Sequence, residues 1–286
     1  MRTVRTVAGL REALAAPRRA GSTIGLVPTM GALHDGHVAL LRRAREECDT
    51  VVMSLFVNPA QFNEAADLAA YPRTEEADAA IARDAGVDVL FAPAVEEVYP
   101  PGFATTVKVA GPALGLEGDA RGPVHFEGVA TVVLKLLNMA MPDVAYFGQK
   151  DGQQLAVIRR LVRDLDVPVR IEAVATVREP DGLALSSRNV RLTPEDRERA
   201  LALRAALQAA EAAVAAGRHE AADVVAAARA AMAPYAVDPE YLAVVDPDTF
   251  TPLDEIDRRA LIAVAARVGD VRLIDNQPLN PNGSAR

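Results

Sequence analysis

Residues 23–37 read TIGLVPTMGALHDGH. The apolar run 23–27 predicts a buried strand, and the helical spacing of apolar residues over 36–47 predicts a helix. A strand, a glycine-bearing turn and a helix, in this order, aim backbone N–H groups at a phosphate. His34 and His37 both lie in this turn. The chemistry of the chain is therefore expected to concentrate here.

The two histidines have three interpretations. They could belong to a metal site, although no third Cys, His or carboxylate follows at a typical metal-ligand spacing. They could cap the helix, or their imidazoles could hold a phosphate beside the helix N-terminus. Gly31 and Gly36 favour the phosphate, because they allow a ligand to approach the backbone closely.

The remaining periodicity predicts an α/β fold. Strands are expected at 50–57, 88–92, 105–109, 144–147 and 169–173, and helices at 75–85, with Thr74 as its cap, 125–141 and 151–163. This alternation indicates a Rossmann-like, doubly wound parallel sheet. Alanine-rich helices over 193–233, beginning at Thr193 and Pro194, then precede strand-like runs at 240–245, 260–267 and 271–275. We expect a smaller C-terminal α+β domain, with domains at 1–176 and 177–286.

Composition excludes several classes of protein. The net charge is −8 and no block of Lys and Arg interleaves with aromatic residues, which argues against binding to nucleic acid. Cys48 is the single cysteine, so an intrachain disulfide and a cysteine-ligated metal cluster are excluded. Its place in an apolar helical pattern predicts a buried structural thiol. No run reaches the roughly 18 apolar residues of a membrane span, so we expect a cytoplasmic protein without a membrane partner.

Polar residues follow two of the predicted strands. Gln61, in the segment NPAQF after the strand at 50–57, suits a hydroxyl or a carboxylate, although an ordinary Asn-Pro turn would explain the segment equally well. Lys150 can neutralise a phosphate, and Asp151 can cap the following helix or help to hold Mg²⁺. Gln154 would face the same pocket from the first turn of that helix. An ordinary helix start is the alternative.

A third polar segment, Ser186-Ser187-Arg188, lies near the boundary between the two predicted domains. Two hydroxyls and a guanidinium suit the oxygens of a triphosphate, whereas a plain polar linker is the competing interpretation. The nucleophile elbow G-x-S-x-G is missing from the sequence, which argues against a serine hydrolase. Together these segments indicate a nucleotide-using α/β enzyme.

Five segments, in this order and spacing, resemble the pantothenate synthetase family, the ATP-dependent ligases that join pantoate to β-alanine. They are PTMGALHDGH, FVNPAQF, AYPRT, FGQKDGQQ and ALSSRN. The resemblance covers essentially the whole chain, including the late segment RLIDN. The sequence departs from the family pattern in two segments. After AYPRT it has Glu75-Glu76-Ala77-Asp78, where relatives tend to be richer in Asp. The other departures are in FGQKDGQQ. Gln149 stands where the family usually has Glu, and Gly152 stands where it often has Tyr, which is expected to loosen the start of the helix.

The resemblance implies a Rossmann-like domain that binds ATP and pantoate, a C-terminal domain that acts as a lid, and a homodimer. It implies catalytic roles for His37 as proton donor, for His34 beside it, and for Lys150 and Arg188. The residues implied to bind ATP are Met30, Gly31, Ala32, Leu33, His34, Asp35, Gly36, His37, Gly148, Gln149, Lys150, Asp151, Val177, Leu185, Ser186, Ser187 and Arg188. Those implied to hold pantoate are Gln61, Gln154 and Asn58, and those implied to bind Mg²⁺ are Asp78 and Asp151.

The reaction implied by the resemblance has two steps. Pantoate and ATP give pantoyl adenylate and pyrophosphate, and the amine of β-alanine then displaces AMP. Two alternatives stay open, a nucleotidylyltransferase that shares the HxGH turn and a non-enzymatic ATP-binding regulator.

Overall fold

A computed structural model describes residues 1–63 and 65–281 of the chain. The chain forms two compact units. The first contains Met1–Gly148 and Val157–Ala175, and the second contains Gln149–Ala156 together with the chain from Thr176 onward. The second unit therefore includes the short stretch that carries Lys150, in addition to the C-terminal part. No helix formed by the described residues is both long and apolar enough to span a membrane.

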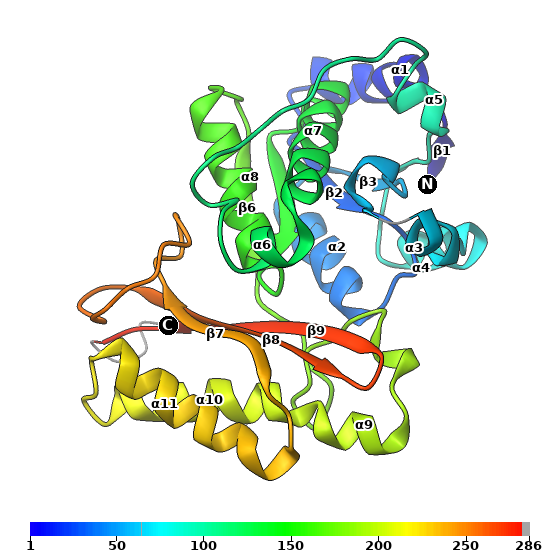
Figure 1. The fold of residues 1–286 in the computed structure, drawn as a ribbon. Coiled ribbons are helices and arrows are strands. Elements are labelled where there is room, and N and C mark those ends of the chain that lie inside the picture. Colours follow the sequence, from blue (N-terminus) through cyan, green and yellow to red (C-terminus); the bar gives the residue numbers. More distant parts are fainter. Residues whose placement is uncertain (64, 282–286) are drawn as a thin grey trace. The chain divides into compact units, whose positions relative to one another are not determined.

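The first unit is built on a six-stranded sheet in which all strands are parallel (Figure 1). The strands are β1 (Arg2–Val4), β2 (Ile24–Thr29), β3 (Thr50–Leu55), β4 (Val89–Phe91), β5 (Val144–Gly148) and β6 (Arg170–Val174). Their order is β1-β4-β3-β2-β5-β6. The direction of winding reverses between β2 and β5, which confirms the predicted doubly wound sheet. Ligands of such sheets bind beyond the carboxyl ends of the strands at this reversal.

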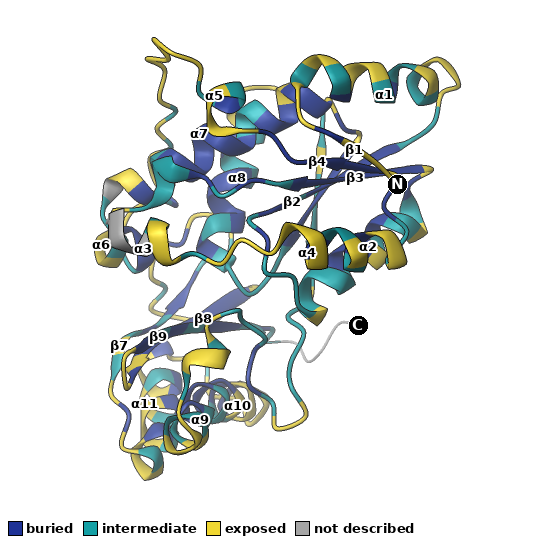
Figure 2. Cartoon of the chain, turned by 90° about the vertical axis from the view of Figure 1, so that its right-hand side faces the viewer, coloured by how far each residue is buried: buried dark blue, intermediate teal, exposed yellow. Residues whose placement is uncertain are grey.

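Helices cover both faces of this sheet. Figure 2 shows α1 and α7 on one face and α2 and α4 on the other, with the strands buried between them. The helices are α1 (Val7–Arg19), α2 (Asp35–Glu47), α3 (Ala65–Ala70), α4 (Glu75–Asp84), α5 (Val95–Val98), α6 (Glu117–Arg121), α7 (Pro123–Ala140) and α8 (Gly152–Asp164), with the 3₁₀ turn η1 (Pro59–Gln61). Aliphatic residues from the strands and from the inner faces of the helices form the core.

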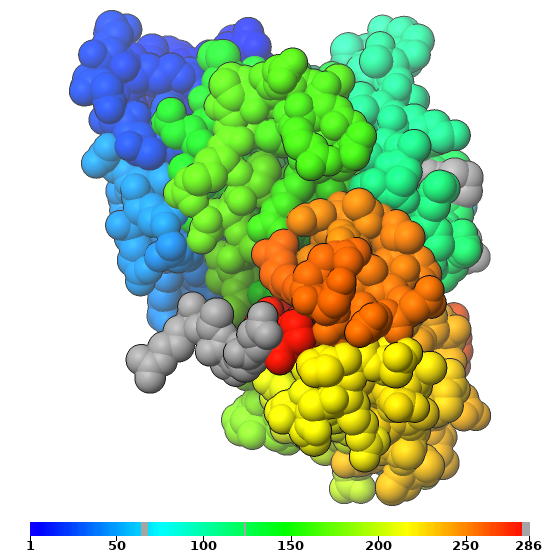
Figure 3. All heavy atoms as spheres, turned by 90° about the vertical axis from the view of Figure 1, so that its left-hand side faces the viewer, coloured from blue at the N-terminus to red at the C-terminus, as the bar shows by residue number. Residues whose placement is uncertain are grey.

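The strands of this unit differ from the prediction in two places. The strand β1 was not expected, because three residues give too short a pattern; it pairs with β4, Val4 opposite Phe91. The expected strand at 105–109 is wrong. This segment is mostly exposed at the surface of the unit (Figure 3). The N–H of Val107 donates to the hydroxyl of Thr131 in α7 at 2.9 Å. Its side chain packs against the cluster of Phe126, Ala130, Val157 and Leu161, so the segment contacts helices instead of a neighbouring strand.

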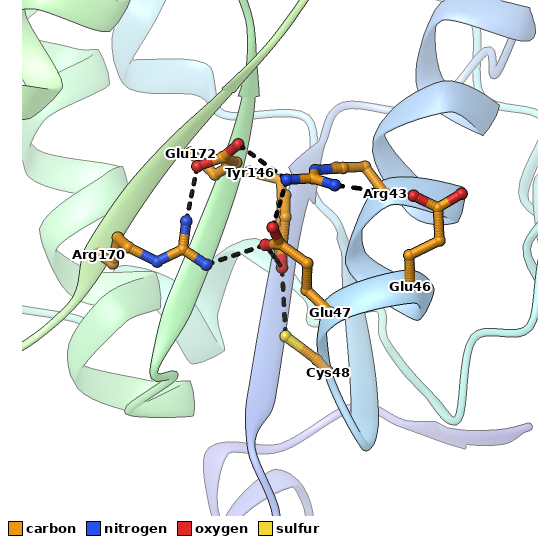
Figure 4. A network of polar contacts seen from close by, with 7 residues as sticks. All are labelled: Arg43, Glu46, Glu47, Cys48, Tyr146, Arg170 and Glu172. Atoms are coloured by element: carbon orange, nitrogen blue, oxygen red, sulfur yellow. Dashed lines mark hydrogen bonds and ion pairs between the residues drawn. The ribbon is translucent and has the colours of Figure 1, made fainter.

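A polar network ties the C-terminal end of α2 to β5 and β6 (Figure 4). The carboxylate of Glu47 accepts hydrogen bonds from the Tyr146 hydroxyl at 2.8 Å and from the Arg170 guanidinium at 2.9 Å. Arg43 also pairs with Glu47. The buried thiol of Cys48 lies 3.2 Å from the Tyr146 hydroxyl, which confirms the structural role predicted for it. The network therefore anchors the helix that begins at the histidine turn.

Replacing Glu47 by glutamine is expected to make folding stability less dependent on pH. The hydrogen bonds from Arg170 and Tyr146 hold the pKa of the Glu47 carboxyl below its usual range. An unfolded glutamate titrates near about 4.3, so the stabilisation is complete above that pH and is lost as pH falls through the lower folded pKa. The difference in Tm between wild type and Glu47→Gln should therefore shrink from pH 7 to pH 3. The exposed neighbour variant Glu46→Gln should change Tm little at any pH, and a Glu47→Gln difference that is constant with pH would contradict the prediction.

The second unit is a three-stranded antiparallel sheet with helices on one face, as expected for a small α+β domain. Its elements are η2 (Asn189–Arg191), α9 (Pro194–Arg199), α10 (Leu201–Ala215), α11 (Ala221–Met232), η3 (Ala233–Tyr235), β7 (Pro239–Val245), β8 (Ala260–Val268) and β9 (Val271–Leu279). Thr193 caps α9 as predicted, because its hydroxyl accepts the N–H of Asp196. A hairpin at Gly269 joins β8 to β9. Alanine and aliphatic side chains fill the space between sheet and helices.

Candidate active site

The carboxyl ends of β2 and β3 lead into the polar segments of the first unit. β2 ends at Thr29, directly before the histidine turn, and β3 ends at Leu55, shortly before Asn58 and Gln61. These two strands pair in register over their whole length. The Nε2 of Gln61 lies 3.2 Å from the Sδ of Met30, so the two segments meet in space. Residues implied to bind ATP and residues implied to hold pantoate are thus brought together within this unit.

His34 and His37 cap the start of α2 for each other. The N–H of His34 donates to Nδ1 of His37 at 3.2 Å, and the N–H of Gly36 donates to Nδ1 of His34 at 3.1 Å. The two rings lie 4.2 Å apart between centroids. A nitrogen that accepts a hydrogen bond carries no proton, so each neutral ring has its N–H at Nε2. Capping and phosphate contact are therefore compatible, because the cap uses Nδ1 as an acceptor and leaves the role of donor to Nε2.

The carboxylate of Asp78, in α4, holds the turn before the two histidines. Its Oδ2 accepts the N–H of Ala32 at 3.0 Å, and its Oδ1 accepts the N–H of Leu33 at 2.8 Å. The side chain is 1% exposed, and the hydroxyl of Thr74 donates to it at 3.0 Å. Ala32 has a φ of +52°, and a Cβ on Gly31 would lie 2.9 Å from Oδ2 of Asp78. The turn therefore wraps closely around this buried carboxylate.

Two expectations change as a result. The N–H groups of Ala32, Leu33, His34 and Gly36 all donate inside the protein, so a phosphate could use them only if these bonds were replaced. A glycine-rich turn can wrap around a carboxylate as well as around a phosphate. The buried carboxylate of Asp78 therefore explains the glycines of this turn equally well. Thr74 also makes no side-chain cap on α4, because its hydroxyl faces Asp78. With these four N–H groups occupied, side chains are the expected donors for a ligand here.

The second unit carries the segment around Lys150. The side-chain amide of Asn276, in β9, donates to the carbonyl oxygens of Gln149 at 2.9 Å and of Lys150 at 2.8 Å. The Nζ of Lys150 lies 3.7 Å from Oδ1 of Asp151. Asn276 therefore fixes the backbone that presents the lysine. Sequence analysis assigned it no role, although it closes the segment RLIDN.

Gly152 begins α8 in a tightly packed position, in contrast to the loose helix start that was expected. A Cβ at Gly152 would lie 3.1 Å from Nδ2 of Asn276 and 3.3 Å from both Leu261 and Phe250. β8 and β9 thus pack closely against the start of α8, in the space that the side chain of a larger residue at position 152 would need. Gln154 is half-buried in the first turn of the helix.

The residues in and near the Ser-Ser-Arg segment that are implied to bind ATP also lie close to one another. The N–H of Leu185 donates to the carbonyl of Val177 at 3.0 Å. In the next turn, the hydroxyl of Ser186 accepts the N–H of Arg188 at 3.2 Å. Asn189 supports this turn from its far end by donating to the carbonyl of Ala184. The segment is therefore an ordered loop and not a plain linker.

A bidentate ion pair stabilises the strand next to this loop. The guanidinium of Arg178 donates to both oxygens of the buried Asp275, at 2.6 and 3.1 Å. A pair of this geometry is rigid as well as strong. Arg178 also donates to the carbonyl of Gly182. Sequence analysis missed this pair because its members are almost a hundred residues apart.

The two residues expected to bind Mg²⁺ differ in their surroundings. Asp78 is buried and receives three hydrogen bonds, so its contacts suit a structural role and not the predicted metal ligation. The side chain of Asp151 is 48% exposed. Within 1–63 and 65–281, no group of three His, Cys, Asp or Glu side chains is arranged to hold a metal ion.

Comparison with known proteins decides the family. Residues 2–278 match the family model of pantoate-beta-alanine ligase. This chain belongs to the pantoate-beta-alanine ligase family. Among its relatives, the pantothenate synthetase of Cereibacter sphaeroides is 53% identical over 96% of this chain and 99% of its own. That of Moorella thermoacetica is 52% identical over 99% of this chain and 100% of its own.

Solved structures of the family share the fold. The crystal structure of pantothenate synthetase from Thermus thermophilus has a TM-score of 0.90 at 52% identity, covering 97% of this chain and 99% of that one. A Francisella tularensis pantoate-beta-alanine ligase, complexed with beta-gamma ATP and beta-alanine, has a TM-score of 0.79 at 33% identity, covering 99% of each chain. The resemblance inferred from the five segments is thereby confirmed.

Proposed function

We propose that this protein joins pantoate to β-alanine with cleavage of ATP to AMP and pyrophosphate, through a pantoyl-adenylate intermediate. Membership of the pantoate-beta-alanine ligase family supports the overall reaction. The observation that supports the chemistry best is the pair of capped histidines, each with its Nδ1 bound to backbone and its N–H at Nε2. Two such donors on one turn suit the negative oxygens of a phosphate.

In the first step, a carboxylate oxygen of pantoate attacks the α-phosphorus of ATP. The new O–P bond forms as the bond from the α-phosphorus to the bridging oxygen breaks, and pyrophosphate leaves. His34 and His37 donate hydrogen bonds to the phosphate oxygens as charge develops there. Gln61 holds the acid. The residues positioned by the capped turn therefore act by orientation and charge stabilisation.

In the second step, the amine of β-alanine attacks the acyl carbon of the adenylate. The C–N bond forms, the C–O bond to AMP breaks, and the amine loses a proton. No nucleophile from the protein takes part. The residues proposed for the second unit are Lys150 and Arg188, which supply positive charge to the nucleotide phosphates, the hydroxyls of Ser186 and Ser187, and Gln154, which contacts pantoate.

Mg²⁺ is proposed as part of the ATP substrate complex. Mg²⁺ in nucleotide sites commonly binds one or two carboxylates, phosphate oxygens and several waters. The exposed carboxylate of Asp151 fits this donor set, and Asp78 does not. The bound ion would offset negative charge on the phosphates. A homodimer is likewise a proposal, which sedimentation equilibrium would test.

One assay tests the function against its alternatives. The protein is incubated with ATP, Mg²⁺ and pantoate, with and without β-alanine, and AMP, pyrophosphate and pantothenate are measured. Pantothenate formed only with both acids supports the ligase, and exchange of labelled pyrophosphate into ATP with pantoate alone supports the adenylate. A dinucleotide product would favour a nucleotidylyltransferase, and ATP binding without turnover would favour a regulator.

Replacing Lys150 by alanine is expected to lower pantoate-dependent ATP–pyrophosphate exchange about 10²–10³-fold, the typical cost of one well-placed charged donor. The backbone at this position should stay in place, because Asn276 binds carbonyl oxygens and not the lysine side chain. Lys108→Ala is the matched control, since the Lys108 side chain is 73% exposed. Exchange near the wild-type rate in folded Lys150→Ala would remove the proposed role.

A further inference from the structure

The side chain of Asn58 is fully used inside the protein. Its Nδ2 donates to Oε1 of Gln61 at 3.0 Å and to the carbonyl of Gly128 at 3.1 Å. Its Oδ1 accepts the hydroxyl of Tyr99 at 2.8 Å and the N–H of Ala60 at 3.3 Å. An amide has two N–H groups and two lone pairs, so all four are taken. With Asn58 only 1% exposed, it has no group left for a substrate.

These contacts determine which end of Gln61 can meet a ligand. Because Oε1 of Gln61 accepts from Asn58, its Nε2 points away, toward Sδ of Met30 at 3.2 Å. Gln61 therefore offers N–H donors. A carboxylate or a hydroxyl oxygen is the matching acceptor, as a hydroxy acid would supply.

Tyr99 holds this chain of amides at its far end. The carbonyl of Gly128, which can only accept, and the N–H of Ala60, which can only donate, direct Nδ2 of Asn58 toward Gln61. The Tyr99 hydroxyl adds the shortest of the contacts of Asn58, at 2.8 Å. Burial raises the pKa of Tyr99 to about 12, so the hydroxyl keeps its proton at neutral pH. The ring is held in place by Phe103, edge to face at 5.2 Å between centroids, and by the ammonium of Lys135, 5.8 Å from the ring centroid.

We propose that Tyr99 is a positioning residue that acts through Asn58 to keep Gln61 as a hydrogen-bond donor to the acid substrate. This proposal rests on the proposed function, in which Gln61 contacts pantoate. Without the hydroxyl, Asn58 loses its shortest contact and keeps only the longer ones, so its NH₂ is held less firmly against Gln61. Gln61 can then rotate its carbonyl oxygen toward the substrate carboxylate, where two acceptors face each other.

The first test is Tyr99→Phe, which removes one oxygen. The KM for pantoate is expected to rise about tenfold, as for the loss of one oriented hydrogen bond. The KM values for ATP and β-alanine should change less than about twofold, and Tyr235→Phe, in the second unit, should change none of the three. A normal KM for pantoate in folded Tyr99→Phe overturns the proposal. If wild type itself forms no pantothenate, the proposed function fails instead.

A double-mutant cycle separates positioning from general support of the fold. If Tyr99 acts through Gln61, adding Tyr99→Phe to Gln61→Ala should raise the KM for pantoate no further. Fully additive effects would overturn the proposal. Asn58→Asp gives a second route, because it keeps the acceptor for Tyr99 but loses the N–H donated to Gln61. It should also raise the KM for pantoate about tenfold, and an unchanged KM would count against the proposal.

Discussion

His37→Ala is expected to lower the rate of pantoate-dependent ATP–pyrophosphate exchange about 10²–10³-fold, because one phosphate donor is lost. The variant also loses the acceptor for the N–H of His34, which should reduce folding stability by about 1 kcal/mol. Exchange is measured with labelled pyrophosphate, and stability by urea unfolding.

A second variant separates the two losses. His37→Asn retains an acceptor close to the position of Nδ1 but has no donor at the position of Nε2. We expect its stability to be near that of wild type and its exchange rate to be as low as that of His37→Ala. Near-normal exchange in either folded variant would show that the Nε2–H of His37 does not act on the phosphates.

Asp78→Asn is expected to be the most damaging change outside the residues that contact substrate. The amide cannot accept from Ala32, Leu33 and Thr74 together, because one of its ends is a donor. Leaving a buried donor unsatisfied costs about 1–3 kcal/mol of stability. The φ of +52° at Ala32 is also no longer held, so the histidines that follow should move and kcat/KM should fall about 10²-fold.

The same variant tests the role of Asp78 against metal binding. If Asp78 positions the turn, excess Mg²⁺ should not restore activity, and the Mg²⁺ concentration giving half-maximal rate should stay near that of wild type. Recovery at high Mg²⁺ would favour metal ligation. Thr74→Val, which removes only the hydroxyl that donates to Asp78, is the matched control and should have a much smaller effect on both stability and activity.

Much of the fold could be predicted because it follows from local patterns. Runs of apolar residues located β2, β3 and β5, and helical spacing located α2 and α7. The pattern failed where an element is short, as in β1, or where apolar residues face a helix and not a strand, as in Val107. In both cases the tertiary partner, and not the local sequence, decides whether the backbone joins a sheet.

The sequence by itself determined the family, the parallel sheet and the residue types at the ends of its strands, because these depend on spacing within short segments. Only the tertiary structure decided what each polar group contacts. The N–H groups of Ala32 and Leu33 meet Asp78 in another helix, and Asn58 meets Tyr99, 41 residues further along the chain. Such pairs form when packing brings distant elements within about 3 Å of each other, a distance that no local propensity encodes. The histidine turn is therefore held by a buried carboxylate from another helix, and this carboxylate positions the histidines that are proposed to contact the phosphate.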